Sequence, residues 1–258
     1  MLQRSHGLVL VALVVILVGV LTEKFLWAQQ GDTLASEDTT GLATHPPGTP
    51  PVWLIHLARR PDRLCAFKEH FKGDFKLWSA TDGLDLTVDE AHAWGVNSII
   101  SEPCAGSDHI RNPGVLGCWI SHKRLLQELQ SEQGDVFIIA EDDAALTVEA
   151  VARFEALRPS LPPTWTLFFL GLWYPSGSPV TSDFWRLDNN NKEQANWGTH
   201  AYAVQRSSLP LILQGLRFMT QPIDLQLSAH FDVWEAYAFT PDLLVQTLPS
   251  SSDISGVH

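Results

Sequence analysis

A strand that ends in three carboxylates constrains the fold of this chain more than any other feature. The run Val136–Ala140 is wholly apolar and contains β-branched and aromatic side chains, which is typical of a buried strand. Glu141, Asp142 and Asp143 follow it directly. Three adjacent carboxylates repel one another and lose hydration at a strand end, so they need a cation. Carboxylate oxygens suit hard divalent ions such as Mn²⁺ or Mg²⁺, and ligands of open α/β sheets bind at the carboxyl ends of strands. The triplet predicts a metal that holds a phosphate-bearing substrate; a solvated acidic turn is the alternative.

Strand and helix patterns alternate over residues 52–258, which predicts an α/β fold with a mainly parallel central sheet and flanking helices. The expected strands cover Val52–Leu57, Phe75–Trp78, Val136–Ala140, Trp165–Leu170 and a segment that ends at Val204. The expected helices are one that carries Leu64, Phe67 and Phe71, then Cys118–Gln130 and Val148–Leu157, and two that open at Ser207–Pro210 and Pro222–Asp224. Turns are expected at Ala80–Gly83 and where Gly114 and Gly117 precede the second helix.

The charge and composition exclude several kinds of partner. The net charge is −12 and the isoelectric point is near 5.1, and no basic run occurs, which argues against nucleic acid and anionic membrane surfaces. The ten tryptophans suit a core of large rings or a sugar-stacking platform. Only Cys65, Cys104 and Cys118 are present, without Cys-x-x-Cys spacing, so a thiolate zinc site is not expected. A Cys104–Cys118 disulfide and three buried thiols are both compatible with this usage.

The N-terminal residues differ from the rest of the chain. Gly7–Leu21 is an unbroken apolar stretch with Arg4 before it and charges after it. It is shorter than the roughly 20 apolar residues of a full span, but Phe25–Ala28 can extend it. We expect an uncleaved signal anchor over residues 1–28, with cleavage after Ala28 as the alternative. Residues 29–51 are polar and proline-rich and predict a stem. Residues 52–258 would then be a domain in the lumen of the secretory pathway, the Golgi or ER.

An ordered set of short motifs runs through residues 52–254 of the chain. The motifs are Leu54–Arg63, Ala80–Gly83, Gly117–His122, Glu141–Asp143, His200–Tyr202, Pro222–Asp224 and Ser252–Ile254. In this order they resemble glycosyltransferase family 25, which includes lipooligosaccharide galactosyltransferases and procollagen galactosyltransferases. The pairing of Gly-Cys-x-x-Ser-His with Glu-Asp-Asp about twenty residues later is the most specific part of the resemblance.

The resemblance implies a GT-A-type fold and an inverting transfer of a sugar, expected to be galactose, from a UDP-sugar. The acceptor would be a hydroxyl of a glycan, a lipooligosaccharide or a glycoprotein. The resemblance also makes Glu141, Asp142 and Asp143 the counterpart of the metal-binding motif of the family, with Asp143 as the first candidate ligand. A divalent metal, Mn²⁺ or Mg²⁺, would stabilise the charge that develops on the departing diphosphate.

The remaining motif residues provide candidates for the donor side of the pocket. The guanidinium of Arg63 could fork onto a diphosphate, and Asp82 could accept hydrogen bonds from uracil or ribose. A surface arginine and a turn-stabilising aspartate are the alternatives. His56 stands where the family usually has Asn and is taken as a donor contact. His122 is expected to hydrogen-bond in the pocket, and Ser121 to start the helix. Adjacent helical residues do not face each other, so this pair is not a hydrolase dyad.

An inverting transfer needs a base on the acceptor hydroxyl, and Asp224 is the candidate for it. It lies in the first turn of an expected helix, where the helix dipole would favour its ionised form. A carboxylate at a helix start with no chemistry is the alternative. His200 and Asp253 are alternates for metal or acceptor contacts, and His200 could equally be a core histidine.

Several positions depart from the family pattern, and all of them are expected at the nucleotide and acceptor rims of the pocket rather than in the carboxylate triplet. Besides His56, they are Ala58, Val115 and Thr166, where polar or acidic residues are usual. A catalytically silent relative that acts in adhesion or binding therefore stays open beside an active transferase, because fold does not imply function. A different metal-dependent phosphate enzyme, such as a nucleotidyltransferase, is the third alternative. It is disfavoured because the chain has no Gly-rich phosphate loop with lysine.

Overall fold

The computed structural model describes residues 50–96, 112–190 and 196–249. The chain divides into two units, Met1–Leu42 and Ala43–His258, and all described residues belong to the second. The expected anchor, nearly all of the stem, Cys104 of the possible disulfide and Asp253 lie outside the described residues. Within the described part of the chain, no helix is long and apolar enough to cross a membrane.

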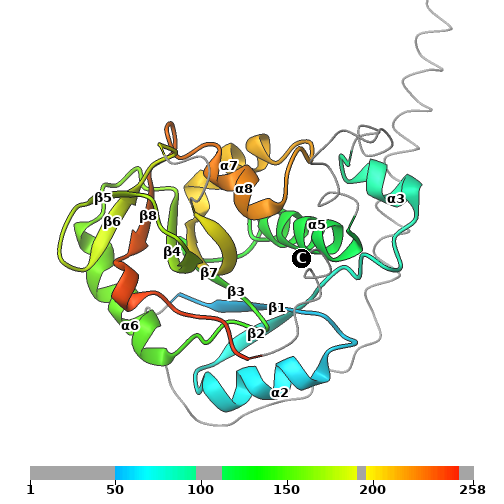
Figure 1. Ribbon diagram of the computed structural model, residues 1–258, viewed down its shortest axis with the longest axis horizontal. Coiled ribbons are helices and arrows are strands. Elements are labelled where there is room, and N and C mark those ends of the chain that lie inside the picture. The colour runs from blue at the N-terminus through cyan, green and yellow to red at the C-terminus, as the bar shows by residue number, and fades with distance from the viewer. Residues whose placement is uncertain (1–49, 97–111, 191–195, 250–258) are drawn as a thin grey trace, which may run out of the picture. The chain divides into compact units, whose positions relative to one another are not determined.

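A single mixed sheet organises the described residues (Figure 1). Its strands are β1 (Val52–His56), β2 (Phe75–Ser79), β3 (Val136–Glu141), β4 (Leu167–Trp173), β5 (Gly177–Pro179), β6 (Phe184–Leu187), β7 (Trp197–Gln205) and β8 (Ala236–Phe239). They are ordered β2-β1-β3-β7-β4-β8-β6-β5. The pairing directions make β2, β1, β3, β4, β8 and β5 run one way and β7 and β6 the other. The expected α/β fold with a mainly parallel sheet is confirmed, and β7 is a reversed strand at its centre.

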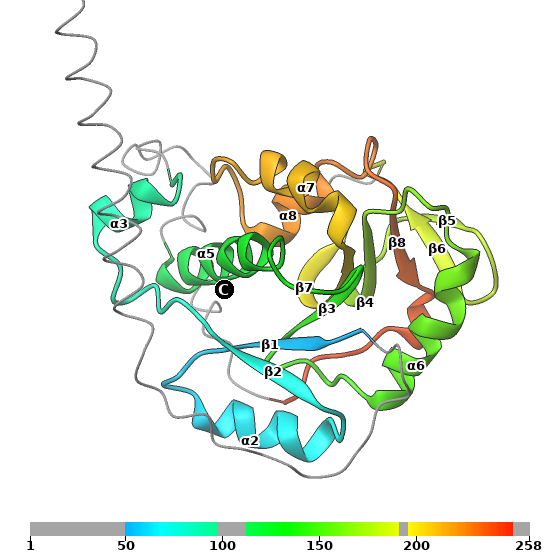
Figure 2. The ribbon, with the colours of Figure 1, turned by 180° about the vertical axis from the view of Figure 1, so that it is seen from behind.

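Helices cover both faces of this sheet. They are α2 (Pro61–His70), α3 (Val88–Ala93), α5 (Pro113–Glu128), α6 (Val148–Leu157), α7 (Leu209–Gly215) and α8 (Ile223–Ser228). Figures 1 and 2 show α2 and α6 on one side of the sheet, and α5, α7 and α8 on the other. The central strands β3, β4 and β7 therefore have buried residues on both faces, which explains why β3 and β4 read as nearly continuous apolar runs.

Helix α5 begins earlier than the sequence indicated. The expected turn at Gly114 and Gly117 is wrong, because both glycines lie inside α5. The side chain of Asn112 accepts a hydrogen bond from the amide of Gly114, and Pro113 occupies the first helical position. An asparagine cap followed by proline is a strong helix start, and it outweighs the poor helix propensity of two glycines. Ser121 accordingly lies in the middle of α5 and does not start it.

The reversed direction of β7 determines what meets at one edge of the sheet. β3 ends at Glu141 and β4 ends at Trp173, and both run in the same direction. Because β7 is antiparallel to both, its first residues, Trp197–His200, begin at the edge where its two neighbours end. Side chains from three strands are thereby brought to the carboxyl end of β3.

Candidate functional site

A surface cavity lies at the carboxyl ends of β1 and β3, beside the first turns of α5. Four of the motifs found in the sequence contribute to its wall, although they lie far apart in the chain. The cavity is lined by Ile55, Leu57, Arg59, Arg63, Ala80, Thr81, Asp82, Gly83, Gly114, Gly117, Cys118, Ser121, His122, Glu141, Asp142 and Asp143. The structure therefore brings together the expected donor residues Arg63, Asp82, Ser121 and His122 and the carboxylate triplet.

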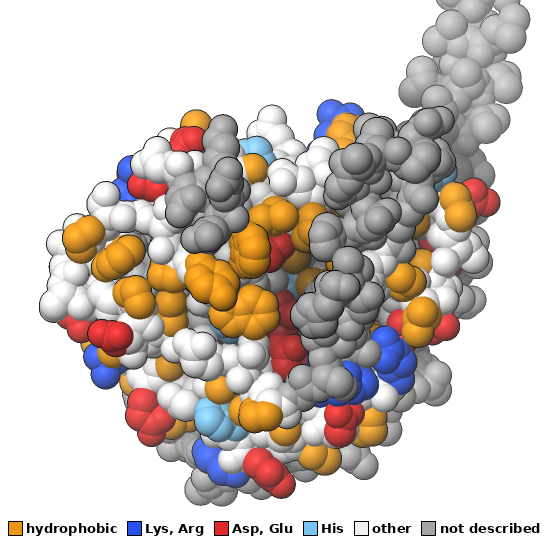
Figure 3. All heavy atoms as spheres, in the orientation of Figure 1, with side chains coloured by type: hydrophobic (Ala, Val, Ile, Leu, Met, Phe, Trp, Pro, Cys, Tyr) orange, Lys and Arg blue, Asp and Glu red, His pale blue; other side chains and the backbone are white. Residues whose placement is uncertain are grey.

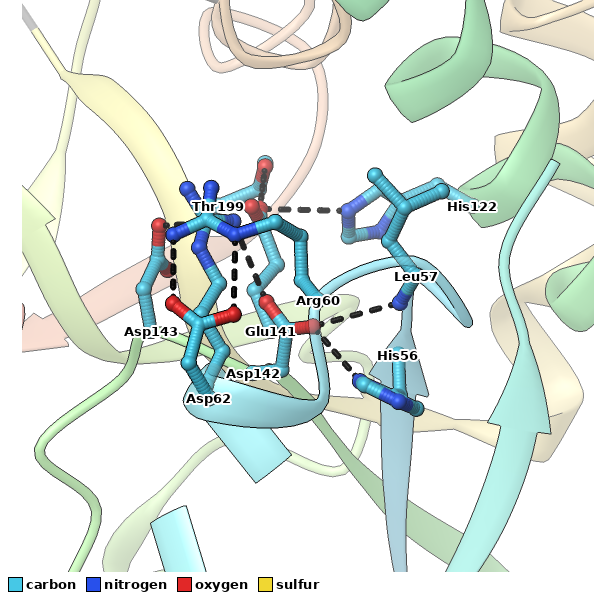
Figure 4. Close-up of polar contacts among 10 residues, drawn as sticks. His56, Leu57, Arg60, Asp62, His122, Glu141, Asp142, Asp143 and Thr199 are labelled. Carbon is cyan, nitrogen blue, oxygen red and sulfur yellow. Dashed lines mark hydrogen bonds and ion pairs between the residues drawn. The ribbon is translucent and has the colours of Figure 1, made fainter. Parts of the chain in front are cut away.

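Glu141 is fixed in its ionised form by two donors (Figure 4). Its Oε1 accepts a hydrogen bond of 2.7 Å from the hydroxyl of Thr199 and one of 3.2 Å from Nε2 of His122. Nδ1 of His122 lies 3.0 Å from the hydroxyl of Tyr202, whose pKa is raised well above its usual value by burial. Burial alone would raise the pKa of Glu141, but the bonds from His122 and Thr199 outweigh it and lower that pKa to about 2.

Asp142 holds strand β3 to its neighbours. Its Oδ2 accepts hydrogen bonds from Nδ1 of His56, at 2.8 Å, and from the amide of Leu57, at 3.2 Å. Its Oδ1 lies 3.2 Å from Nη1 of Arg63 in a buried ion pair. Only 3% of Asp142 is exposed, so these bonds satisfy a carboxylate that is almost fully buried. Within the triplet, Asp142 is thus the residue whose oxygens are occupied by hydrogen bonds to the protein. One of these bonds comes from His56 at the end of β1.

Asp143 is the member of the triplet whose charge is least stabilised. Burial and the negative charge of Glu141 raise the pKa of its carboxyl to about 7, against the opposing effect of Arg63, whose Nη1 lies 3.6 Å away. A carboxylate in this state fits a divalent cation, because the ion would neutralise two carboxylates that otherwise repel each other. Glu141 and Asp143 are the carboxylates of the cavity that could hold a divalent ion such as Mn²⁺ or Mg²⁺.

The opposite wall of the cavity is a close contact between a turn and a helix. The hydroxyl of Ser121 donates to the carbonyl of Gly117 and accepts from the amide of Thr81 at 2.8 Å. Asp82 caps the turn through the amide of Leu84, and its other oxygen lies 2.6 Å from Nε of Arg59. Asp82 is thus a turn-stabilising residue that also lines the cavity, and its contact with a nucleotide remains a prediction.

Asp224 lies outside the cavity wall but is connected to it through β7. Its Oδ2 accepts a hydrogen bond of 2.8 Å from the amide of Gly198, next to the Thr199 that binds Glu141. Burial and the charge of Glu141 raise the pKa of Asp224, although backbone amides of Gly198 and Leu225 oppose this. The amide of Leu225 at the helix start favours the ionised form, as expected, but burial outweighs it, so the net shift of the pKa is upward. Helix α8 has only six residues, and desolvation outweighs its dipole.

His200 occupies a closed position behind these groups. Its Nε2 lies 2.9 Å from the carbonyl oxygen of Val245, and its ring is tilted against that of Trp173 with 5.6 Å between centroids. Only 3% of it is exposed, and burial lowers its pKa, so it is a neutral core histidine rather than a surface ligand. This arrangement matches the alternative that the sequence left open for it.

The sequence did not single out several residues of the site. Thr199, Arg59 and Thr81 contact candidate residues, and Cys118 lies with His122 and Glu141 so that their ligand atoms are within 4.8 Å of one another. The signal available was position alone, because each is adjacent to a quoted motif or lies within one. Thr199 precedes His200, for example, but only the reversed direction of β7 shows that it reaches Glu141.

Comparisons with known proteins leave the family unassigned. No protein-family model matches the sequence, and no curated protein matches it significantly. Among solved structures, the chain is similar to a CMP:2-keto-3-deoxy-manno-octonic acid synthetase complexed with CTP. The TM-score is 0.38 and the sequence identity is 13%, over 79% of this chain and 93% of that one.

Proposed function

We propose that this chain is a metal-dependent inverting glycosyltransferase that moves a sugar, expected to be galactose, from a UDP-sugar to a hydroxyl of a glycan or glycoprotein. The observation that carries the proposal is the convergence of Arg63, Asp82, Ser121–His122 and Glu141–Asp143 on one cavity. These residues were selected from sequence motifs resembling glycosyltransferase family 25. The proposal includes an N-terminal anchor over residues 1–28 that places the domain in the secretory lumen.

The roles of the residues follow from their environments. Glu141 and Asp143 would hold the divalent ion, and Arg63 beside them adds a positive charge to the same wall. Asp224 would accept the proton of the acceptor hydroxyl while the oxygen of that hydroxyl bonds to the anomeric carbon of the donor sugar. The bond to the diphosphate breaks on the opposite face, and the electron pair leaves with the diphosphate. A carboxylate whose pKa is raised by burial is a stronger base than an exposed one, which suits this role.

Calorimetry of nucleotide binding tests the proposal directly. UDP should bind in Mn²⁺, and a chelator should abolish most of that affinity, because the carboxylates repel a diphosphate without a bridging cation. GDP and CMP serve as controls for recognition of the uracil base. Equal UDP affinity with and without the chelator would remove the metal role given to Asp143. A chain that binds none of these nucleotides would support the silent relative.

A further inference from the structure

Three large aromatic side chains are exposed together where β4 ends and β7 begins. Trp173, Tyr174 and Trp197 are 44%, 65% and 39% exposed, and we call them the aromatic platform. Trp173 pairs with Trp197 across the two strands, and the ring of Tyr174 meets that of Trp197 edge-on at 5.9 Å. In Figure 3, hydrophobic side chains gather over β4 and β7 beside acidic side chains in a hollow. Rings of this size are normally buried, so their joint exposure indicates a binding surface.

The backbone holds the platform in a conformation that costs free energy. Tyr174 and Asn196 both have positive φ, 52° and 60°, a region that non-glycine residues rarely adopt. The side chain of Asn196 secures this turn, because its Oδ1 accepts from the amide of Ser176 and its Nδ2 donates to the carbonyl of Asp188. These hydrogen bonds therefore hold the backbone of the turn in the conformation in which the ring of Tyr174 is exposed.

The layer behind the platform is also rigid. The ring of His200 lies 5.6 Å from that of Trp173 and is held by the carbonyl of Val245. Two glycines make room for this ring, since a Cβ on Gly171 or Gly198 would come within 2.6 or 2.9 Å of it. A preformed aromatic surface loses little conformational entropy when it binds a ligand, which lowers the free-energy cost of binding.

Four consecutive residues of β7 connect the platform to the candidate chemistry. Trp197 contributes a ring, the amide of Gly198 binds Asp224, the hydroxyl of Thr199 binds Glu141, and His200 packs behind Trp173. The platform is thus linked to the base proposed above through Gly198, the residue that follows Trp197. The adjoining charges are the carboxylates Asp224 and Glu141, which disfavour an anionic ligand.

We propose that the aromatic platform binds a neutral pyranose ring of the acceptor and presents a hydroxyl to Asp224. A pyranose has an apolar C–H face that stacks on an indole or phenol ring and a hydroxyl edge that stays hydrated or reaches a carboxylate. This inference rests on the proposed function and narrows its acceptor class to a neutral saccharide, in preference to an amino-acid side chain. The platform residues are positioning residues, and Asp224 remains the catalytic one.

Saccharide binding by saturation-transfer NMR tests the inference with the full chain. The probes are the methyl β-glycosides of glucose, galactose and N-acetylglucosamine, and lactose, in UDP and Mn²⁺. The first variant is Tyr174→Asn, because asparagine tolerates positive φ and removes only the ring. The second is Trp197→Leu, with Trp197→Phe as its conservative partner and Phe218→Ala, an exposed ring after α7, as the matched control.

At least one probe should bind the wild-type chain, and Tyr174→Asn and Trp197→Leu should weaken it about tenfold. Trp197→Phe and Phe218→Ala should retain the binding, and all four variants should retain UDP affinity. The inference is overturned if no probe binds the wild-type chain, or if Tyr174→Asn binds as well as wild type. If the saccharides bind through the platform but UDP does not bind at all, the proposed transferase is wrong and the platform stands as a saccharide site alone.

Discussion

At the scale of single residues, three adjacent carboxylates of similar chemistry have three different environments. Hydrogen bonds from Thr199 and His122 keep Glu141 ionised, and Asp142 is surrounded by hydrogen-bond donors. The pKa of Asp143, in contrast, is raised to about 7. The sequence could identify the triplet as a candidate metal site. It could not divide the roles, because the partners of Asp142 are as distant as His56, 86 residues away. Local spacing carries no information about contacts of that range.

The raised pKa of Asp143 predicts how stability depends on pH when no metal is bound. Its carboxyl binds a proton more tightly in the folded chain, pKa about 7, than in the unfolded one, near 3.8. Its contribution to the free energy of unfolding is therefore present at low pH and lost as pH rises from about 4 to 7. Asp143→Asn should stabilise the chelator-treated protein at pH 8 by at least about 1 kcal/mol more than at pH 5. Urea denaturation at both pH values measures this difference.

The exposed Asp89 of α3 provides the control, since Asp89→Asn also removes one negative charge but from a hydrated position. Its effect should be nearly the same at both pH values. An equal effect of Asp143→Asn at pH 5 and pH 8 would mean that Asp143 is not destabilised by its neighbours. Adding Mn²⁺ should reverse the order of wild type and Asp143→Asn at pH 8, because the ion needs the carboxylate.

A comparison of Asp143→Asn with Asp224→Asn separates donor binding from chemistry. Asp143→Asn should weaken metal-dependent UDP-sugar binding and turnover together. Asp224→Asn should leave UDP-sugar affinity nearly unchanged and reduce turnover by roughly 10²–10⁴, the usual contribution of a general base. Because burial raises the pKa of Asp224, the acid limb of kcat/KM should lie above the ordinary aspartate value of about 3.9. Near wild-type transfer by Asp224→Asn would show that this carboxylate only accepts structural hydrogen bonds from the amides of Gly198 and Leu225.

At the scale of elements, the sequence predicted the strands and helices whose cause is local. Helix α6 has the expected bounds, Val148–Leu157, because its apolar period and the capping Thr147 are both legible in the sequence. The strands β5, β6 and β8 and the short helix α3 were not expected. The first three have only three or four residues each: β5 and β6 form a short hairpin, and β6 and β8 are placed by pairing between distant segments. Such short segments carry too few residues for a period to appear.

Helix α5 packs closely on the turn before α3 through Gly117. A Cβ at Gly117 would lie 2.5 Å from the carbonyl oxygen of Thr81 and 2.8 Å from the amide of Gly83. Both neighbours are backbone, so they cannot rotate away. Gly117→Ala should destabilise the protein by about 1–3 kcal/mol, although alanine is the better helix former by about 1 kcal/mol. Thermal denaturation measures this, with the exposed Gln127→Ala of the same helix as a control within about 0.5 kcal/mol.

The same change tests whether this contact shapes the cavity. Thr81, Gly83 and Gly117 all line it, so a displaced turn should also lower UDP affinity in Gly117→Ala. Gln127 lies outside the lining, and Gln127→Ala should bind UDP as wild type does. If Gly117→Ala is more stable than wild type, the turn at Thr81–Gly83 must shift to accommodate the new Cβ at little cost. The higher helix propensity of alanine would then dominate the change in the free energy of unfolding.

At the scale of the whole molecule, one reversed strand unites two candidate subsites. The cavity depends on β1, β3 and α5, and the aromatic platform depends on β4 and β7. The start of β7 lies between them and binds Glu141 and Asp224. The alternation of strands and helices was enough to predict the α/β class. It could not predict that β7 is reversed, because direction within a sheet depends on connections and packing rather than on the composition of the strand.

The net charge of the chain limits how it can be attached to a membrane. A protein of net charge −12 is repelled by anionic lipid, so surface electrostatics cannot hold it on a membrane. If residues 1–28 are an uncleaved anchor, attachment depends on the apolar segment Gly7–Leu21 and is independent of salt. The full chain should therefore stay with membranes in 1 M salt, where a Debye length of about 3 Å screens charge contacts, and in alkaline carbonate. Replacing two leucines of the segment, Leu10 and Leu13, by arginine should release it. An N-terminal sequence that begins at Gln29 would show that the segment is a cleaved signal peptide and that the domain is secreted.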